Sequence, residues 1–215
     1  MRPGAAVALV PHDRLGDRAH AGAIAWLVRT CGEESTFVYR LRQWLLGISG
    51  AAGPETAAWP WVTGSAAWVG PSCVAIMALQ KESLRRPSAV IRGRMEAGRR
   101  FLLTRACAEG GWNHGSPAAF GRDLPPYPET TGMGLAALRG VRSPVVDRAL
   151  DRAASFLREC RSADALNWLR LGLAAHGRLP QGFSAPPGIE RRTLPENSLD
   201  LLAASAKNGE QLFWS

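Results

Sequence analysis

The chain has 215 residues, of which 46% are hydrophobic and 20% are charged, and its formal net charge at pH 7 is +8. This composition is sufficient for one domain with a sizeable core and excludes wholesale disorder. The longest apolar runs, such as Gly4–Val10 and Cys73–Leu79, are far shorter than the roughly 20 residues that span a bilayer. We therefore expect a cytoplasmic protein without a membrane span.

The charge and the cysteines limit the classes of partner. Lys81 and Lys207 are the only lysines, so arginine carries nearly all of the positive charge. The arginines are spread along helical patterns without a long basic block, which indicates solvated helix faces rather than a nucleic-acid-binding surface. Anionic small molecules stay open as partners. The four cysteines are scattered without a C-x-x-C pair, so we expect reduced thiols, no metal site and no cofactor.

Taken in chain order, two kinds of helical pattern alternate along the sequence. Amphipathic patterns predict outer helices near residues 20–31, 88–107 and 144–160. Patterns that are apolar on most sides predict buried inner helices near residues 71–80, 130–139, 166–176 and 196–206. The segment Pro3–Val10 is similar to the end of a further inner helix. Helices that alternate in this way predict an all-α fold of helical hairpins, with an apolar inner layer and a wet outer layer.

The inner helices carry an internal repeat. Trp68–Leu79 aligns with Tyr127–Leu138, which places Ser72 on Thr131, and the Pro-Glu start of the second unit recurs at Pro195. The period is near 60 residues. Each unit opens with Pro and a hydroxyl or amide residue, which is typical of a capped helix start. The repeat supports one hairpin per unit.

One outer segment ends in a motif with a known spacing. Gly98-x-x-Phe101-Leu102, Ala106 and Gly110-x-Trp112 match the QW repeat of squalene–hopene cyclases at every spacing, with Ala106 in place of the signature Gln. A looser copy of the motif runs from Trp26 to Phe37. We expect the glycine to allow a tight turn and Trp112 to pack back over the end of the outer helix.

On these motifs the chain resembles the prenyltransferase/squalene-cyclase superfamily of terpene cyclases, and more closely small bacterial squalene-cyclase-like proteins of unassigned function. The resemblance covers Ala19 to Phe213 and also rests on WPWVTGSAAWVGPS, GGWNHG…PYPETT and NWLRLGLAAHG. His114 stands where that pattern has Tyr, and Gly70 stands where it has Glu. The resemblance implies an α/α-toroid whose inner helices surround an apolar cavity, and isoprenoid substrates.

A toroid of this superfamily needs more helix pairs than the sequence supplies. We therefore expect residues 1–215 to form a single toroid-like domain that is an incomplete ring lacking N-terminal repeats, as in a truncated or late-started chain. An open arc of this kind exposes apolar edges, and such edges favour self-association.

The resemblance implies two mechanisms, and the residues for both are missing from this sequence. Triterpene cyclases protonate an alkene with an Asp-x-Asp-Asp acid, and protein prenyltransferases activate a thiolate with zinc held by Asp-x-Cys and a distant His. Asp147 and Asp151 lie four apart on an outer helix, which indicates solvated ion pairs. His176 closes an inner helix, where a structural role at the helix end is the simpler interpretation.

Six residues remain as site candidates. The catalytic candidates are His114, Asp123 and Glu129, and the ligand-binding candidates are Trp61, Trp68 and Tyr127. Each has a structural alternative: a loop hydrogen bond for the histidine, a turn for the aspartate, helix capping for the glutamate and an ordinary core for the aromatic residues. The segment between His114 and Tyr127 has no evident counterpart in the other units.

Two functions stay open. The missing acid and zinc motifs favour a non-catalytic protein that binds an apolar, isoprenoid-like ligand or a partner. The alternative is an isoprenoid cyclase or prenyltransferase with a diverged active site.

Overall fold

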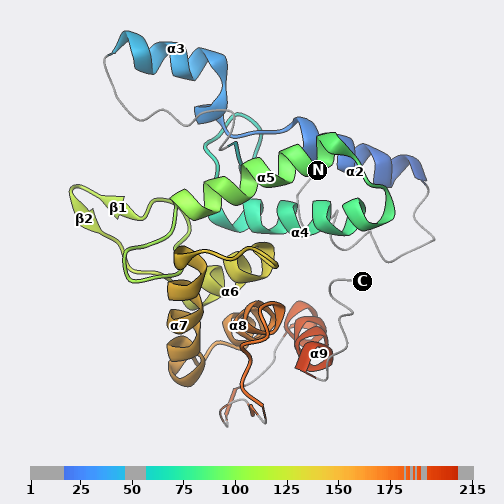
Figure 1. Ribbon diagram of the computed structural model, residues 1–215, viewed down its shortest axis with the longest axis vertical. Helices are drawn as coiled ribbons and strands as arrows, with labels where there is room; N and C mark the ends of the chain where they lie inside the picture. The colour runs from blue at the N-terminus through green and yellow to red at the C-terminus, as the bar shows by residue number, and fades with distance from the viewer. Residues whose placement is uncertain are drawn as a thin grey trace. The chain divides into compact units, whose positions relative to one another are not determined.

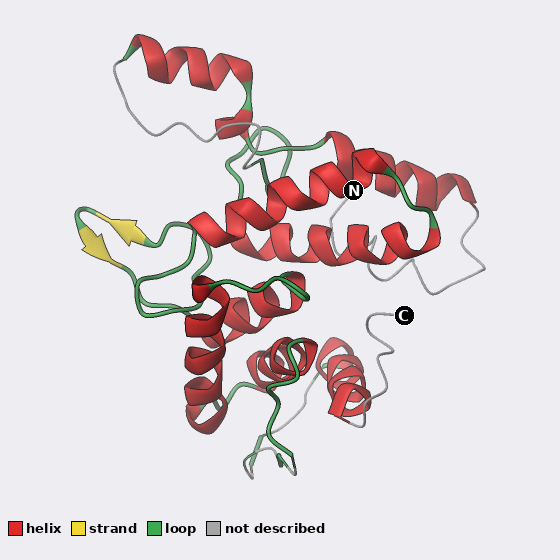
Figure 2. Ribbon diagram, in the orientation of Figure 1, coloured by secondary structure: helices red, strands yellow, loops and turns green. Residues whose placement is uncertain are grey.

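The computed structural model describes residues 17–46, 57–181, 183, 184, 186, 188, 189 and 193–207. The regular structure in this part of the chain is helical apart from one two-stranded hairpin and one isolated bridge (Figure 1, Figure 2). The all-α prediction is therefore confirmed. The chain divides into two compact units, with the boundary between Thr104 and Arg105. The helix tail predicted at Pro3–Val10 lies outside the described residues.

The first unit is built on a helical hairpin. Its elements are α2 (Asp17–Arg29), the 3-10 helix η1 (Glu33–Ser35), α3 (Phe37–Leu45), α4 (Val69–Arg85) and α5 (Ala89–Thr104). The hairpin forms because α4 is small and aliphatic on most sides while α5 has one apolar side, which buries Met95, Phe101 and Leu102. Helix α4 packs against α5, and α2 contacts both of them.

The second unit holds the hairpin of strands and the remaining helices. Its elements are β1 (Ala118–Ala119), the antiparallel β2 (Arg122–Asp123), α6 (Pro128–Ala137), α7 (Pro144–Glu159), α8 (Ala163–Ala175) and α9 (Leu194–Lys207). Helix α8 contacts α6, α7 and α9, and α6 also contacts α7. The amphipathic α7 buries Val146, Leu150 and Leu157, as its periodicity predicts.

Helices α6 and α8 run parallel and lie almost backbone to backbone. A Cβ added to Gly132 would lie 2.5 Å from the Leu169 nitrogen. A Cβ added to Gly172 would lie 2.6 Å from the Gly132 carbonyl oxygen and 2.9 Å from the Leu135 Cβ. Gly132 on α6 lies near Leu169 on α8, and Leu135, further along α6, lies near Gly172, further along α8. The two helices therefore run in the same direction. Glycine is required at this contact, since any side chain would push the helices apart.

Helix α9 continues the parallel layer but is not buried as predicted. The Asn167 amide donates to the Glu196 carbonyl oxygen at 3.3 Å, and the Arg170 guanidinium pairs with Asp200 at 2.7 Å. These pairs align α9 parallel to α8. Two of its large apolar residues, Leu194 and Leu201, are nevertheless exposed. The expectation of a helix buried on most sides is therefore wrong for α9, which lies against α8 with one face only.

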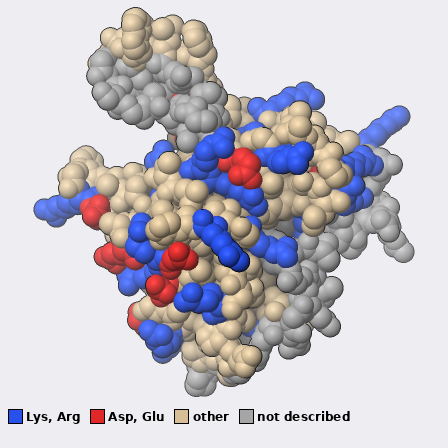
Figure 3. All heavy atoms as spheres, in the orientation of Figure 1, with Lys and Arg blue, Asp and Glu red and all other residues tan. Residues whose placement is uncertain are grey.

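The predicted helices coincide with α2 and with α4 to α9, while α3 and the strand hairpin were not predicted. Phe37, which the motif spacing predicts to be the aromatic end of a QW-like repeat, begins α3. The arginine-rich faces lie at the surface of the units, where Figure 3 shows Lys and Arg side chains beside Asp and Glu. Asp151, for example, forms an exposed ion pair with Arg178 at 3.3 Å, as expected for a solvated face.

Candidate functional site

The predicted site aromatics lie on or at the ends of two loops that are closed in the same way. We call them the Trp59 loop (residues 59–68) and the Trp112 loop (residues 112–127). The Trp68 N–H donates to the Trp59 carbonyl at 3.0 Å, and the Tyr127 N–H donates to the Trp112 carbonyl at 2.8 Å. Each loop therefore begins and ends at one backbone hydrogen bond, and each leads directly into a buried helix, α4 or α6.

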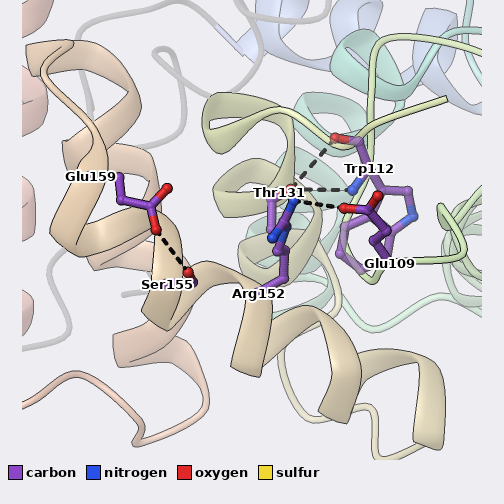
Figure 4. Close-up of polar contacts among 6 residues, drawn as sticks. All are labelled: Glu109, Trp112, Thr131, Arg152, Ser155 and Glu159. Carbon is purple, nitrogen blue, oxygen red and sulfur yellow. Dashed lines mark hydrogen bonds and ion pairs between the residues drawn. The ribbon is translucent and has the colours of Figure 1, made fainter.

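A hydroxyl group in the first turn of each helix holds the base of its loop. The Trp59 N–H donates to the Ser72 hydroxyl oxygen at 3.1 Å. The Trp112 N–H donates to the Thr131 hydroxyl oxygen at 3.2 Å (Figure 4). The internal repeat that aligned these two hydroxyl residues is confirmed at the level of single hydrogen bonds. Their predicted role in capping is wrong, since neither α4 nor α6 has a side-chain cap hydrogen bond at its N-terminus, and both hydroxyl groups instead accept from the N–H of the tryptophan that begins the loop.

The two tryptophans that anchor the loops are fully buried, and each packs on a glycine. A Cβ added to Gly98 would lie 2.5 Å from the Trp59 ring, and one added to Gly134 would lie 2.5 Å from the Trp112 ring. The expectation was that Trp112 packs over the end of the outer helix. In the structure the Trp112 indole packs on α6, the inner helix that follows, because Gly134 leaves room for it there. The packing over the end of the outer helix stays a prediction.

A half-buried arginine completes the anchor of the Trp59 loop. The Arg94 guanidinium lies 3.5 Å from the centre of a Trp59 ring and donates to the carbonyl oxygens of Thr30 at 2.7 Å and Ala57 at 2.8 Å. Burial lowers the pKa of Arg94 to about 10. Carbonyl groups and an aromatic face stabilise this cation. Sequence reasoning missed Arg94, because nothing in the pattern distinguishes it from the other arginines of α5.

Both loops expose aromatic side chains beside these buried anchors. Trp61 is 56% exposed, Trp68 is 40% exposed and Tyr127 is 44% exposed. The Trp61 ring lies over Gly70 at the start of α4, where an added Cβ would be 3.3 Å from it. The alternative that these residues belong to an ordinary core is therefore wrong for all three. They form surface that a ligand can reach.

In the Trp112 loop the structure brings His114 and Tyr127 together. Their ring centroids are 5.3 Å apart and the ring planes are inclined by 42°. The loop hydrogen bonds expected of His114 belong instead to its neighbour: the Asn113 amide donates to the Ser116 carbonyl at 2.8 Å and accepts from the Gly115 N–H at 3.0 Å. Sequence reasoning missed Asn113, although Asn two residues before Gly is a turn signal.

The strand hairpin is the part of the Trp112 loop that makes it longer. Nine positions separate Trp59 from Trp68, whereas fifteen separate Trp112 from Tyr127. The expectation that this segment has no counterpart is therefore wrong in part: the loop as a whole corresponds to the Trp59 loop, and the strand hairpin is the added part. At its tip Phe120 is fully exposed and has a φ of 52°, a left-handed conformation that is unusual for a bulky residue.

Asp123 lies on this hairpin, away from any organised acid site. It is exposed on β2, where it pairs with Ala118. Its carboxylate is close enough to Cys107 to affect that thiol, whose pKa is raised first by burial and further by Glu109 and Asp123. Asp123 lies two positions after the turn at Phe120 and Gly121, close to the turn predicted at this aspartate. This position favours a structural role for Asp123.

Glu129 belongs to a group of acids at the starts of parallel helices. Glu129 lies in the first turn of α6, Asp164 in that of α8 and Glu196 in that of α9. Burial raises the pKa of Asp164, and the charges of Glu129 and Glu196 raise it further. Glu196 and Thr193 form a capping box, with a Thr193 N–H to carboxylate distance of 2.8 Å. Acids suit these positions because helix N-termini are electropositive.

The raised pKa of Asp164 predicts a pH-dependent stability difference. Because the folded state favours the protonated acid, Asp164 contributes most stability below the ordinary carboxyl pKa of about 4. This contribution is lost as the pH rises through the raised folded pKa. We expect Asp164→Asn to gain stability relative to wild type as the pH rises from acid to neutral. Thermal unfolding at several pH values measures this, and a difference that is constant with pH would contradict it.

The catalytic candidates do not form one constellation. Within the described residues the structure shows no hydrogen bond, ion pair or ring contact among His114, Asp123 and Glu129, and no group of three or more His, Cys, Asp or Glu that could hold a metal ion. His176, the histidine weighed against the zinc mechanism, lies at the end of α8 with its Nε2 3.0 Å from the Leu135 carbonyl oxygen. Burial lowers the pKa of His176. A structural hydrogen bond therefore accounts for this residue.

The fold and the two loops define an all-α protein with paired, tryptophan-anchored surface loops. Compared with known proteins, the chain shows no significant match to a family model, a curated protein or a solved structure. No helix in the described part of the chain is long and apolar enough to cross a membrane.

Proposed function

We propose that the chain is a non-catalytic binding protein of the terpene cyclase/prenyltransferase type, which binds an apolar, isoprenoid-like ligand. The carrying observation is the exposure of Trp61, Trp68 and Tyr127 on loops whose bases are rigidly held. Exposed aromatic rings that are fixed by buried anchors lose little conformational entropy when they bind an apolar ligand. In this proposal each loop binds ligand through its own exposed aromatic side chains. The proposal also includes the ring of inner helices around an apolar cavity that the resemblance implies.

The positions of the candidate acids support a binder over an enzyme. Alkene protonation requires an acid held beside the substrate and strengthened by its neighbours. Asp123 is exposed on a hairpin, and the pKa of Asp164, the acid that interacts with Glu129, is raised first by burial and then by the charges of Glu129 and Glu196, which makes Asp164 a weaker acid. This arrangement favours ligand binding without turnover.

A second copy of the same chain is the other partner that the exposed surface supports. Leu194 and Leu201 are exposed on α9, on the face that α8 leaves uncovered. Apolar side chains at the edge of a parallel helix layer can pack against a second copy of the same edge.

Binding and turnover of isoprenoids distinguish the two functions. We expect farnesol to quench tryptophan fluorescence saturably, and we expect squalene and farnesyl diphosphate to be recovered unchanged. Trp61→Ala should weaken farnesol binding at the Trp59 loop, and Tyr127→Ala binding at the Trp112 loop, each by about tenfold, since a stacked aromatic side chain contributes roughly 1–1.5 kcal/mol. Each variant should therefore keep wild-type affinity at the loop that it leaves intact. Phe120→Ala, which removes an equally apolar ring from the hairpin tip, is the matched control and should bind normally.

The enzyme alternative predicts a different result. Product formation from squalene or farnesyl diphosphate that is abolished by Asp123→Asn or Glu129→Gln would replace the binding proposal with a cyclase or prenyltransferase. Farnesol binding that is equally strong in wild type, Trp61→Ala and Tyr127→Ala would exclude the aromatic loops as the site.

A further inference from the structure

Helix α3 carries an apolar surface that the first unit does not bury. Its large apolar side chains, and that of the residue after it, are between 43% and 76% exposed; they are Phe37, Val38, Leu41, Trp44, Leu45 and Leu46. Its principal neighbour in the described part of the chain is the short helix η1. In Figure 3 the part of α3 in view is tan, so the surface there comes from residues other than Lys, Arg, Asp and Glu.

The five of these residues that belong to α3 form one stripe along the helix. An α-helix has 3.6 residues per turn, so positions 37, 38, 41, 44 and 45 of α3 fall within an arc of about 120°. A stripe of this width normally faces a core. Here it is exposed together with two aromatic residues, Phe37 and Trp44, of a kind that is enriched at the boundary between lipid head groups and acyl chains.

The charges of the helix select its partner. The only charged residues between Phe37 and Leu45 are Arg40 and Arg42, and helical periodicity places positions 40 and 42 on opposite borders of the apolar stripe. A second copy of this chain would bring like charges together, and the whole chain already carries +8. An anionic lipid surface offers the opposite charge beside an apolar layer.

We propose that α3 docks on anionic lipid surfaces, lying in the plane of the membrane with its apolar stripe in the head-group boundary. Nine residues of helix are about 13 Å long, which is enough to lie on a bilayer and too short to cross it. The proposal does not depend on the ligand of the aromatic loops. It gives the first unit a peripheral membrane site.

Cosedimentation of the full chain with vesicles tests the charge part of the proposal. We expect strong partition onto vesicles of equal parts phosphatidylcholine and phosphatidylglycerol, weak partition onto phosphatidylcholine alone, and a fall in binding as salt is added. The double variant Arg40→Gln/Arg42→Gln should bind the anionic vesicles about 25-fold more weakly, since each basic residue near such a surface contributes about fivefold. Equal partition onto both kinds of vesicle would overturn the anionic selectivity.

A matched pair of leucines tests the apolar part. Leu45 in α3 and Leu84 in α4 are each 70% exposed. We expect Trp44→Ser/Leu45→Ser to lower partition at least about tenfold, whereas Leu84→Ser leaves it unchanged. Val38→Ser is a second, milder variant should the double variant lose helix content by circular dichroism. An equal loss in Leu84→Ser, or a wild type that does not partition, would overturn the proposal.

Sedimentation equilibrium without lipid tests the remaining alternative, in which a second copy of the chain covers α3. A wild-type dimer that Trp44→Ser/Leu45→Ser converts to a monomer, together with no vesicle binding, would show that a second copy covers α3 and would overturn the lipid assignment.

Discussion

Replacing Gly132 with alanine is expected to destabilise the second unit by about 3 kcal/mol, because the added methyl group has no space. The new Cβ would lie 2.5 Å from the Leu169 nitrogen, and the opposing atoms of α8 are backbone rather than a flexible side chain. Helices α6 and α8 must therefore separate, and the packing on both sides of them must change. Urea denaturation followed by circular dichroism measures the loss.

A glycine without close neighbours provides the control for this substitution. Gly93 lies within α5, and an added Cβ there would meet nothing within 4 Å. Gly93→Ala is expected to stabilise the protein by about 0.5–1 kcal/mol, since alanine has the higher helix propensity. If both substitutions changed stability in the same direction and by the same amount, the close contact of α6 with α8 would not be what requires Gly132.

Trp59→Ala is expected to cost about 3–5 kcal/mol of the stability of the first unit. The substitution removes a fully buried indole and leaves a cavity beside Gly98. It also removes the indole N–H that donates to the Leu27 carbonyl at 2.8 Å and the ring on which Arg94 stacks. Unpaired buried polar groups add to the cost of the cavity. Thermal and urea unfolding measure the effect.

Trp61→Ala, two residues further along the same loop, is the matched control. Because Trp61 is more than half exposed, its removal should change stability by less than about 1 kcal/mol. The two variants therefore separate the structural tryptophan from the one proposed to bind ligand. A loss of stability in Trp61→Ala as large as that in Trp59→Ala would show that both residues serve the fold.

The helices were predictable because their signals are local. Apolar residues three and four positions apart mark the buried side of α5 and α7, and near-continuous apolar runs mark α4, α6 and α8. The internal repeat also identified Ser72 and Thr131 as equivalent, and both occupy the same position in their loops. Patterns of this kind depend on residues within a few turns of one another.

The site was less predictable because its contacts connect distant segments. Trp61, Trp68 and Tyr127 were identified as candidates by residue type, but their exposure depends on how the loops turn. His114 was expected to hydrogen-bond within its loop, and Asn113 does so instead. Helix α3 was missed because an aromatic residue at a motif spacing outweighed a short amphipathic pattern.

Apart from α3, the sequence alone determined which segments of the described chain are helical, which of them are apolar, and that the units repeat. The tertiary structure decided the rest. Arg94 reaches the Thr30 carbonyl across 64 positions of sequence, and Gly132 meets α8 more than 30 residues later. Local periodicity fixes which side of a helix is apolar, whereas only packing fixes which atoms meet that side and whether water still reaches it.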